Sequence, residues 1–335
     1  LGIVERSLDA VRAGMLLALA YPDRIGKRRQ GSPGRYLLSN GRGAYLRERQ
    51  ALSSEEFIVA AHLDGSEREA AIYMAAPVGE EEIERDFAED IEEVELVEWD
   101  DTIKGVASRR QRRLWSLVLA DSPLADPPAE KVLKAFLDGI RNLGLGVLPW
   151  DRTAEALRER MTFLSRLSGQ TGVEFPSLTD EFLLDDLEGW LGPFVSGMTR
   201  VEHLKRLDLK AALLSLVDRE RRKALDVLAP THVTVPTGSR IPLDYGGERP
   251  SLSVRLQELF GLAKTPAVAS GRVPVVIQLL SPAGRPVQVT DDLAGFWARS
   301  YELVKKEMKG RYPKHHWPDD PLAAEPTRRA KRKGE

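Results

Sequence analysis

The chain has 335 residues, of which 42% are apolar and 30% are charged, and its formal net charge at pH 7 is −2. That length accommodates about two or three domains of roughly 150 residues each, and the composition is that of an ordinary soluble globular protein. The absence of cysteine excludes disulfides and thiolate metal sites and makes the cytoplasm the expected compartment. No apolar run approaches the roughly 20 residues that a membrane-spanning helix needs, so no membrane span is expected.

The charge is unevenly distributed along the chain. Residues 80–101 are almost wholly acidic, residues 104–113 are basic, and the tail from Lys305 is basic as well. Local patches, more than the net charge, decide where a polyanion can bind. The near-neutral total therefore does not indicate a nucleic-acid-binding protein, whereas the basic segments remain candidates for such contacts.

Apolar residues at helical spacing predict a first helix over residues 4–20. Its apolar face is expected to hold Leu8, Val11, Met15 and Leu19. Tyr21-Pro22 should end this helix, because proline removes a backbone donor and restricts the residue before it. We expect residues 1–30 to be the last helix of a helical bundle and a linker, since this helix alone has no partner for its apolar face.

From residue 31 to residue 125 the pattern changes to short strands. Turn signals at Asn40-Gly41, Asp64-Gly65 and Lys104-Gly105 separate them. The predicted strands are residues 35–38, 44–46, 57–63, 70–76, 94–99 and 114–120, and a helix is predicted at residues 80–87. This many short strands in so short a segment predicts a small barrel, for which an OB-like barrel is the natural candidate.

Residues 126–230 are expected to form a helical connector. A proline-containing linker at residues 121–128 precedes it, and Pro230 closes it. The helices should be interrupted at residues 143–146, 169–176 and 192–193. Thr179 or Asp180 is a suitable N-cap for the helix that carries Phe182, Leu183, Leu187 and Trp190.

Residues 231–335 are expected to form a mixed α/β C-terminal domain with a basic, disordered tail at residues 328–335. The predicted strands are residues 232–235, 240–244, 273–279 and 286–289, and the predicted helices are residues 252–260 and 291–308. Asp291 or Asp292 can cap the last helix, whose apolar face should hold Leu293, Phe296, Trp297 and Val304. The expected fold class is therefore multidomain α+β.

Two dense motifs lie in this last segment. They are His232-Val-Thr-Val-Pro-Thr-Gly-Ser-Arg-Ile-Pro-Leu-Asp-Tyr245 and Gly310-Arg-Tyr-Pro-Lys-His-His-Trp-Pro-Asp-Asp-Pro321. Together with residues 16–25 and 34–43, they resemble the C-terminal region of HrpB-type bacterial helicases, a branch of the DEAH-box ATP-dependent helicases. The resemblance covers essentially the whole chain. However, the sequence holds no Gly-x-x-x-x-Gly-Lys-Ser/Thr phosphate cradle and no Asp-Glu-Ala-His box. We therefore expect the chain to be part of a longer protein whose ATP motor lies upstream of Leu1.

The resemblance implies an accessory half of an ATP-dependent helicase, with single-stranded nucleic acid as partner and RNA favoured over DNA. The upstream RecA-like domains would hold ATP and Mg²⁺, and no cofactor and no catalytic residue are expected in this chain itself. The resemblance also implies an OB-fold after the helical bundle. An alternative function is a protein-interaction module that tethers the motor to a partner. An unrelated enzyme is less well supported, because no nucleophile elbow or paired-carboxylate signature is present.

The cluster Arg109-Arg-Gln-Arg-Arg113 suggests a nucleic-acid contact, because basic side chains at a barrel rim bind the phosphodiester backbone in OB-folds. An equally good interpretation pairs these arginines with the acidic residues 80–101, and the two interpretations are compatible if they hold for different arginines. The full set of candidate nucleic-acid-binding residues is Arg42, Lys104, Arg109, Arg110, Arg112, Arg113, Arg240, Arg311 and Lys314. The nearby aromatic residues Tyr36, Tyr45, Trp99 and Trp115 could stack on bases, although core packing is favoured for each.

Three further features have structural and functional interpretations. The turn Thr237-Gly-Ser-Arg240 could bind an anion, but a tight hairpin is favoured. The proline-rich segment 311–321 could contact nucleic acid or a partner, but a clasp that closes the C-terminal domain is favoured. The histidines are scattered, so no metal site is expected.

Overall fold

The computed structural model describes residues 10–65 and 69–328, so Leu8 and residues 329–335 lie outside the described part. The chain divides into two compact units, residues 1–135 and residues 136–335. The architecture is mixed α+β, with a closed five-stranded barrel in the first unit and several helices in the second.

The first helix, α1 (Ala10–Ala20), ends before the 3₁₀ turn Pro22–Arg24, as the Tyr21-Pro22 signal predicts. Met15 and Ala18 of α1 are buried in the core of the first unit, but Leu19 is 55% exposed. Gly14 allows the helix to approach so closely that a Cβ at this position would lie 1.8 Å from the carbonyl oxygen of Pro77. The expectation that α1 has no partner within this chain is therefore wrong, because it packs on the barrel.

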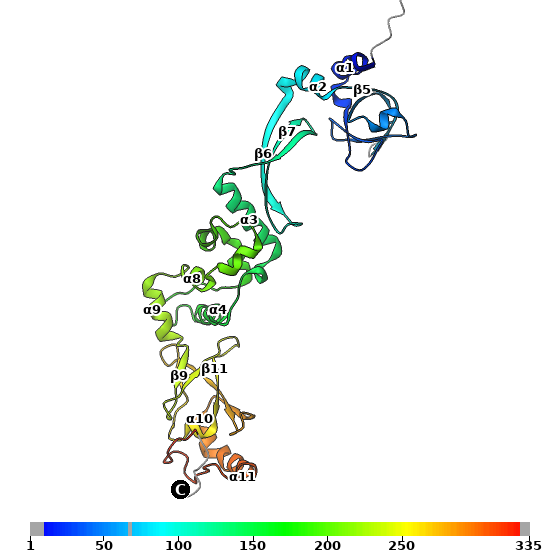
Figure 1. Cartoon of the computed structure of the whole chain (residues 1–335). Coiled ribbons are helices and arrows are strands. Elements are labelled where there is room, and N and C mark those ends of the chain that lie inside the picture. The colour runs from blue at the N-terminus through cyan, green and yellow to red at the C-terminus, as the bar shows by residue number, and fades with distance from the viewer. Residues whose placement is uncertain (1–9, 66–68, 329–335) are drawn as a thin grey trace, which may run out of the picture. The chain divides into compact units, whose positions relative to one another are not determined.

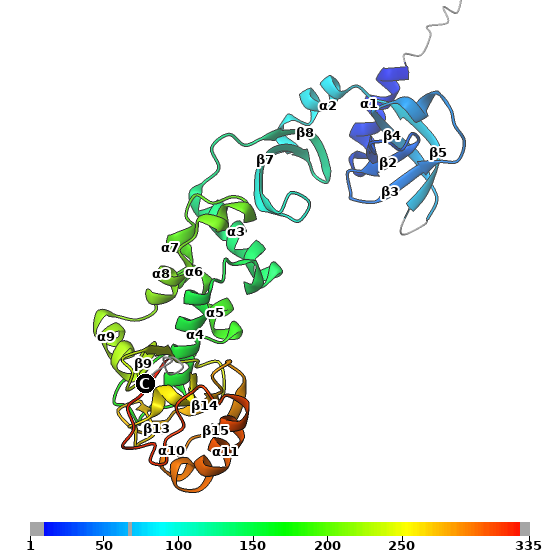
Figure 2. The ribbon, with the colours of Figure 1, turned by 60° about the horizontal axis from the view of Figure 1, so that its bottom comes forward.

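The barrel closes in the order β1-β2-β3-β5-β4 (Figure 2). Its strands are β1 (Ile25–Arg28), β2 (Arg35–Leu38), β3 (Gly43–Leu46), β4 (Phe57–Leu63) and β5 (Glu69–Pro77). β3 and β5 are parallel, and every other neighbouring pair is antiparallel. Tyr36, Leu38, Ile58, Ala60 and Ile72 fill the interior. The sequence did not predict β1, because its Gly-Lys-Arg residues lack the apolar alternation of a strand.

The strands predicted at residues 94–99 and 114–120 do not belong to this barrel. They form a separate antiparallel sheet of β6 (Ile91–Asp100), β7 (Gly105–Leu114) and β8 (Leu117–Pro123), joined to β5 by helix α2 (Glu80–Asp86) (Figure 1). β6 and β7 carry charged residues on both faces, so they cannot line a barrel interior. Only the end with Leu114, Leu117 and Leu119 joins the apolar cluster with α1, β1 and β4.

Helices dominate the second unit as far as Leu228, as predicted. They are α3 (Ala129–Leu143), which spans the division between the units, α4 (Arg152–Ser165), α5 (Asp180–Asp185), α6 (Leu187–Trp190), α7 (Gly192–Val195), α8 (Leu209–Leu214) and α9 (Arg219–Leu228). Thr179 caps α5, since its side chain accepts a hydrogen bond from the Phe182 amide. The buried Arg160 of α4 donates to the carbonyl oxygens of Leu225 and Ala229 and so satisfies the C-terminal end of α9.

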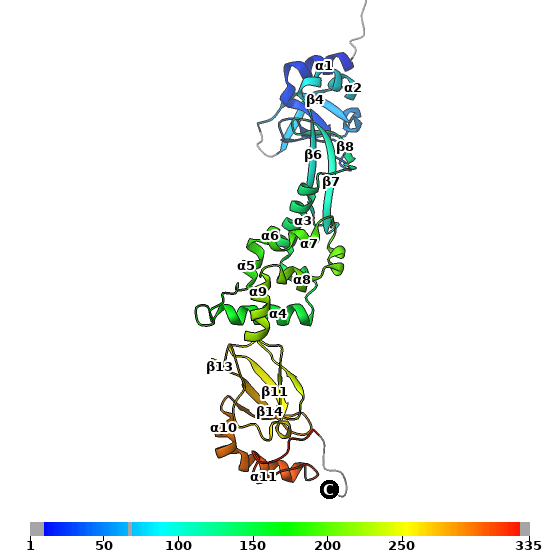
Figure 3. The ribbon, with the colours of Figure 1, turned by 90° about the vertical axis from the view of Figure 1, so that its left-hand side faces the viewer.

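The remaining segment contains short strands and two helices around a three-stranded sheet (Figure 3). Its elements are β9 (His232–Thr234), β10 (Arg240–Pro242), β11 (Ser251–Arg255), β12 (Ala267–Val268), β13 (Val273–Pro274), β14 (Val276–Leu280), β15 (Pro286–Thr290), α10 (Leu293–Gly295), a π-helical turn Phe296–Ser300 and α11 (Tyr301–Arg311). The helix predicted at residues 252–260 is wrong. Residues 251–255 alternate between buried and exposed positions and pair in parallel with β14, and only a 3₁₀ turn follows.

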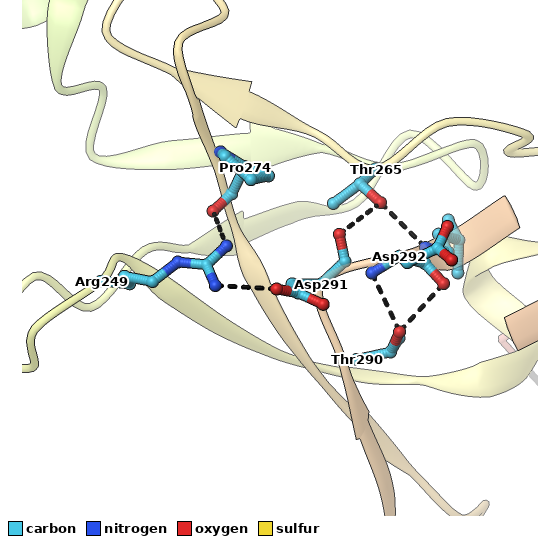
Figure 4. A network of polar contacts seen from close by, with 7 residues as sticks. Arg249, Thr265, Pro274, Thr290, Asp291 and Asp292 are labelled. Carbon is cyan, nitrogen blue, oxygen red and sulfur yellow. Dashed lines mark hydrogen bonds and ion pairs between the residues drawn. The ribbon is translucent and has the colours of Figure 1, made fainter. Parts of the chain in front are cut away.

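A polar network fixes the junction between β15 and α10 (Figure 4). Arg249 donates to the Asp291 carboxylate at 2.7 Å and to the Pro274 carbonyl oxygen at 3.1 Å. Asp292 caps α10 by accepting from the Gly295 amide, as predicted. The Arg249 hydrogen bond holds the pKa of Asp291 below its usual value, and the Gly295 amide does the same for the pKa of Asp292.

The proline-rich segment after α11 packs back onto the second unit. Trp317 is only 8% exposed, and its indole nitrogen donates to the Tyr312 carbonyl oxygen at 3.0 Å. The Tyr301 hydroxyl donates to the Pro318 carbonyl oxygen, and the Lys305 ammonium lies 2.6 Å from the Asp319 carboxylate. These contacts fix the segment on α11 and support the clasp interpretation.

Replacing Trp317 with alanine should lower the free energy of unfolding of the second unit by about 3 kcal/mol, because a large buried ring is removed. A denaturant or thermal melt measures the effect. Leu303→Ala is the matched control, since Leu303 lies on α11 and is 75% exposed. Equal melting temperatures for Trp317→Ala and the control would contradict the clasp.

Stability of the second unit should also depend on acid pH through Asp291. Its pKa is lower in the folded state, so its contribution is present above the unfolded pKa of about 3.9 and is lost as pH falls through the lower folded value. Arg249→Gln removes the main cause and should make the loss of stability below about pH 4 shallower. Arg285→Gln, an exposed arginine in the same sheet region, should keep the wild-type slope; identical slopes for both variants would refute the assignment.

Candidate nucleic-acid interface

The arginines of β7 lie on two different faces of the sheet. Side chains alternate along a strand, so Arg109 and Arg113 share one face with Gln111, and Arg110 and Arg112 share the other. We call these the Gln111 face and the Arg110 face. The cluster is thus two separate surfaces, in line with the alternative that the two interpretations hold for different arginines.

The Arg110 face is matched by acidic residues. Arg110 lies 3.4 Å from Glu95 of the neighbouring strand, and Arg112 lies 2.5 Å from Glu84 of α2. Both carboxylates belong to the acidic segment 80–101. These two arginines therefore pair with the acidic segment, which is the alternative to phosphate binding that the sequence left open.

The Gln111 face holds a hydrogen-bonded row that ends at β8. Arg113 donates twice to the Gln111 side-chain oxygen, at 2.8 and 2.6 Å. Gln111 in turn donates to Asp121 at 3.0 Å, and Arg109 donates to the same carboxylate oxygen at 3.2 Å. These bonds of Arg113 go to a neutral amide, which leaves the positive charge of its guanidinium in place.

A groove of about 470 Å³ lies between this face and β1, and we call it the β1–β7 groove. Lys27, Arg28 and Arg29 form one wall, and Gln111 and Asp121 belong to the other. The Lys27 ammonium donates to the carbonyl oxygens of Val118 and Leu119 at 2.9 and 3.1 Å and so ties β1 to β8. The buried Nε of Arg28 has no hydrogen-bond partner among the described residues.

The sequence analysis missed Lys27, Arg28 and Arg29. The signal in the sequence is a run of three consecutive cations, and it has no place on a surface without the unpredicted strand β1. A predicted strand there would have placed the run on the barrel, next to the β7 arginines.

Arg42 and Lys104 are not brought together. Arg42 is exposed in the turn after β2, close to the β7–β8 turn, where the Ser116 amide donates to the Ser39 carbonyl oxygen. Lys104 lies in the β6–β7 turn with Asp101 at 3.4 Å. The length of β7, at about 3.4 Å per residue, separates Lys104 from the Arg113 end by roughly 30 Å.

The three candidates of the second unit lie in different elements. Arg240 begins β10, Arg311 ends α11 and lies 3.1 Å from Glu307, and Lys314 belongs to the clasp. The turn before Arg240 is the predicted hairpin between β9 and β10. The hydroxyls of Ser239 and Thr237 donate to Glu258 at 2.6 and 3.2 Å, so an internal carboxylate already takes the place of an external anion.

The aromatic candidates differ in how far they are exposed. Tyr36 is fully buried in the barrel, as the core-packing interpretation predicts, and Tyr45 and Trp99 are half-buried. Trp115 is 44% exposed and contacts Phe87 edge to face. The most exposed tyrosine among the described residues is Tyr73, at 51%, which the sequence analysis did not single out.

Within residues 10–65 and 69–328, no cluster of three or more histidine and carboxylate side chains is arranged to hold a metal ion. Across the same residues, no helix has the length and apolar content needed to cross a membrane.

Comparison with known proteins shows the family to which the chain belongs. Residues 190–321 match the family model HrpB_C, described as ATP-dependent helicase C-terminal. Over 327 residues the chain is 43% identical to the ATP-dependent RNA helicase HrpB of Escherichia coli strain K12, covering 97% of this chain and 40% of that protein.

Solved structures agree with this placement. The crystal structure of the E. coli DExH-box NTPase HrpB matches with a TM-score of 0.60 and 44% identity, over 95% of this chain and 39% of that one. A second crystal structure, of the E. coli DEAH/RHA helicase HrpB, gives a TM-score of 0.53 and 40% identity, over 91% and 38%. The chain thus spans about two fifths of the length of these relatives. The resemblance to the C-terminal region of HrpB-type helicases, inferred from the sequence, is confirmed.

Proposed function

We propose that this homologue of the C-terminal region of HrpB is the accessory part of a cytoplasmic ATP-dependent helicase, with RNA as the favoured substrate. The upstream RecA-like domains of the same polypeptide would hold ATP and Mg²⁺. Two facts support this division of labour. The chain is 43% identical to a protein named an ATP-dependent RNA helicase, and its own sequence holds neither a phosphate cradle nor a DEAH box.

The barrel would be of the OB type in this proposal. Its support is the closed order β1-β2-β3-β5-β4 of short strands, in an arrangement that suits oligonucleotide binding. The four-part division into residues 1–30, 31–125, 126–230 and 231–335 would change at the barrel. The barrel would run from Ile25 to Pro77, and the separate sheet of β6, β7 and β8 would follow it.

The single observation that carries nucleic-acid binding is the β1–β7 groove. Lys27, Arg28 and Arg29 line one wall, and Gln111 lines the other. Arg109 and Arg113 lie on the same face of β7 as Gln111, beside the groove and outside its lining. A groove with one cationic wall and further arginines beside the other can follow a phosphodiester backbone without reading its bases. The two arginines of the Arg110 face have no part in this contact.

The second candidate function, a protein-interaction module, has one observation in its favour. Leu16 and Leu19 are 69% and 55% exposed, and their spacing places them on one face of α1. Exposed neighbouring apolar residues are typical of a contact with another protein surface. A partner that binds there would be displaced by Leu16→Glu, and the groove variants below would leave it bound.

The triple variant Arg29→Ala, Arg109→Ala, Arg113→Ala should bind single-stranded RNA more weakly, by a similar factor for every sequence. The slope of log K against log salt should fall by about 0.7 for each phosphate that is no longer neutralised, so by about 2 in total. A fluorescence-anisotropy titration at several salt concentrations measures both quantities. The matched control is Arg110→Ala, Arg112→Ala on the opposite face of the same strand, which should keep the wild-type slope. Equal effects of both variants, or no effect of either, would rule out the groove.

Purified residues 1–335 should neither bind nor hydrolyse ATP. The physical reason is that phosphoryl transfer needs a cradle for the phosphates and side chains that hold Mg²⁺, and the sequence carries neither signature. Calorimetric titration with ATP and a phosphate-release assay test the two statements. Saturable turnover above that of an identically purified blank would contradict them.

A further inference from the structure

β5 exposes an aromatic side chain on the outside of the barrel. Tyr73 is 51% exposed, while Ala71 and Ile72 before it are buried. The His62 ring of β4 lies 5.1 Å from the Tyr73 ring, centroid to centroid, with 38° between the planes. The Arg47 guanidinium, just after β3, lies 4.8 Å from the Tyr73 ring centroid and donates to the Tyr73 hydroxyl at 2.8 Å. Three adjacent strands thus present one exposed stack, here called the Tyr73 stack.

Cations lead from this stack toward the β1–β7 groove. Two residues after Arg47, Arg49 lines a cavity of about 410 Å³ together with Arg28, Ser53 and Ser54. Among the described residues that line this cavity there is no carboxylate. Arg28 also lines the β1–β7 groove, so the two hollows share one side chain. A strand held by its phosphates in the groove can therefore continue past Arg28 and Arg49 to Tyr73.

The contacts within the stack are weak enough to be exchanged. A cation–π contact at an exposed site contributes about two- to five-fold to an equilibrium constant. A base stacked on an aromatic side chain contributes about five- to 150-fold. An unpaired base can therefore displace the Arg47 guanidinium from the Tyr73 ring with a net gain. The displaced guanidinium then becomes available to a phosphate, and His62 can extend the stack on the same surface.

We propose that the Tyr73 stack binds an unpaired nucleobase of a single-stranded nucleic acid. The proposal rests on the proposed function, because the groove must first hold the strand. The Tyr73 stack adds a preference for unpaired bases, which the groove alone does not supply. Bases in a duplex are stacked on their own neighbours on both faces, so a duplex can occupy the groove but leaves the Tyr73 ring unused. The chain should therefore prefer single strands that have bases over duplexes and over abasic strands.

The test compares Tyr73→Ala with two controls in the 335-residue chain. Tyr73→Phe keeps the ring and removes only the hydroxyl. Tyr21→Ala removes a similar exposed cation–π pair outside the Tyr73 stack. Tyr21 is 41% exposed, and the Arg24 guanidinium lies 4.6 Å from its ring centroid. The probes are a single-stranded oligoadenylate RNA, an abasic strand of equal length and the corresponding duplex. A 2-aminopurine placed in the single strand reports stacking through quenching of its fluorescence.

Tyr73→Ala should weaken binding of the oligoadenylate about five-fold or more and abolish the quenching, while leaving affinity for the abasic strand unchanged. Tyr73→Phe and Tyr21→Ala should both behave as wild type, and a melt of each variant confirms that it is folded. If Tyr73→Ala lowers affinity for both strands equally, or for neither, the stack does not bind a base. If the wild-type chain binds neither strand even at low salt, the groove and the stack are both refuted. Salt-dependent wild-type binding without a preference for bases refutes the stack alone.

Discussion

The hydrogen bonds of the Lys27 ammonium determine how the first unit presents its charges. They join β1 of the barrel to two carbonyl oxygens of β8, and the Glu56 carboxylate lies 3.5 Å from the same ammonium. Hydrogen bonds to a charged donor contribute roughly 1.5–3 kcal/mol, more than a neutral pair. The apolar cluster of Ile25, Leu114, Leu117 and Leu119 lies at the same junction. This junction holds β1 beside β8, and the groove lined by β1, Gln111 and β8 lies there.

Because side chains alternate along β7, its arginines lie on two opposite faces of the sheet. Arg112 meets Glu84, which lies 28 residues earlier in a helix, and Arg109 meets Asp121 across the hairpin. Neither partner is visible from the sequence, because each depends on the strand register and on where α2 lies. The sequence did reveal that both cations and a compensating acidic segment were present. It could not reveal that the two interpretations apply to opposite faces of one strand.

Local signals predicted most elements, and long-range pairing explains the misses. The cap at Thr179, the hairpin at Gly238 and the turn at Lys104-Gly105 depend on a few neighbouring residues, and the structure has all three. β1 and β11 are stabilised mainly by their neighbours, β2 and β4 in one case and β14 in the other, so their own residues gave a weak or misleading pattern. Tyr73 was missed for a similar reason, since only the closed barrel determines which side of β5 faces outward.

Ion pairing by itself does not exclude an arginine from phosphate binding. Exposed pairs contribute only about 0–1 kcal/mol, so exchanging a carboxylate for a phosphate costs little. What differs between the faces of β7 is the charge that surrounds each pair. On the Arg110 face, Glu93 and Glu95 lie opposite the two arginines in register, and Glu84 adds a third carboxylate, so carboxylates outnumber cations. Near the Gln111 face, the cations are Lys27, Arg28, Arg29, Arg109 and Arg113. They outnumber the carboxylates there, which are Glu56, Glu92 and Asp121. If a polyanion displaced the carboxylates from the arginines of the Arg110 face, the surplus of carboxylates there would repel it. On the Gln111 face, the surface would remain positive after the same exchange. The local charge balance, set by which strand lies beside which, is therefore the reason why the proposed nucleic-acid contact is assigned to the Gln111 face.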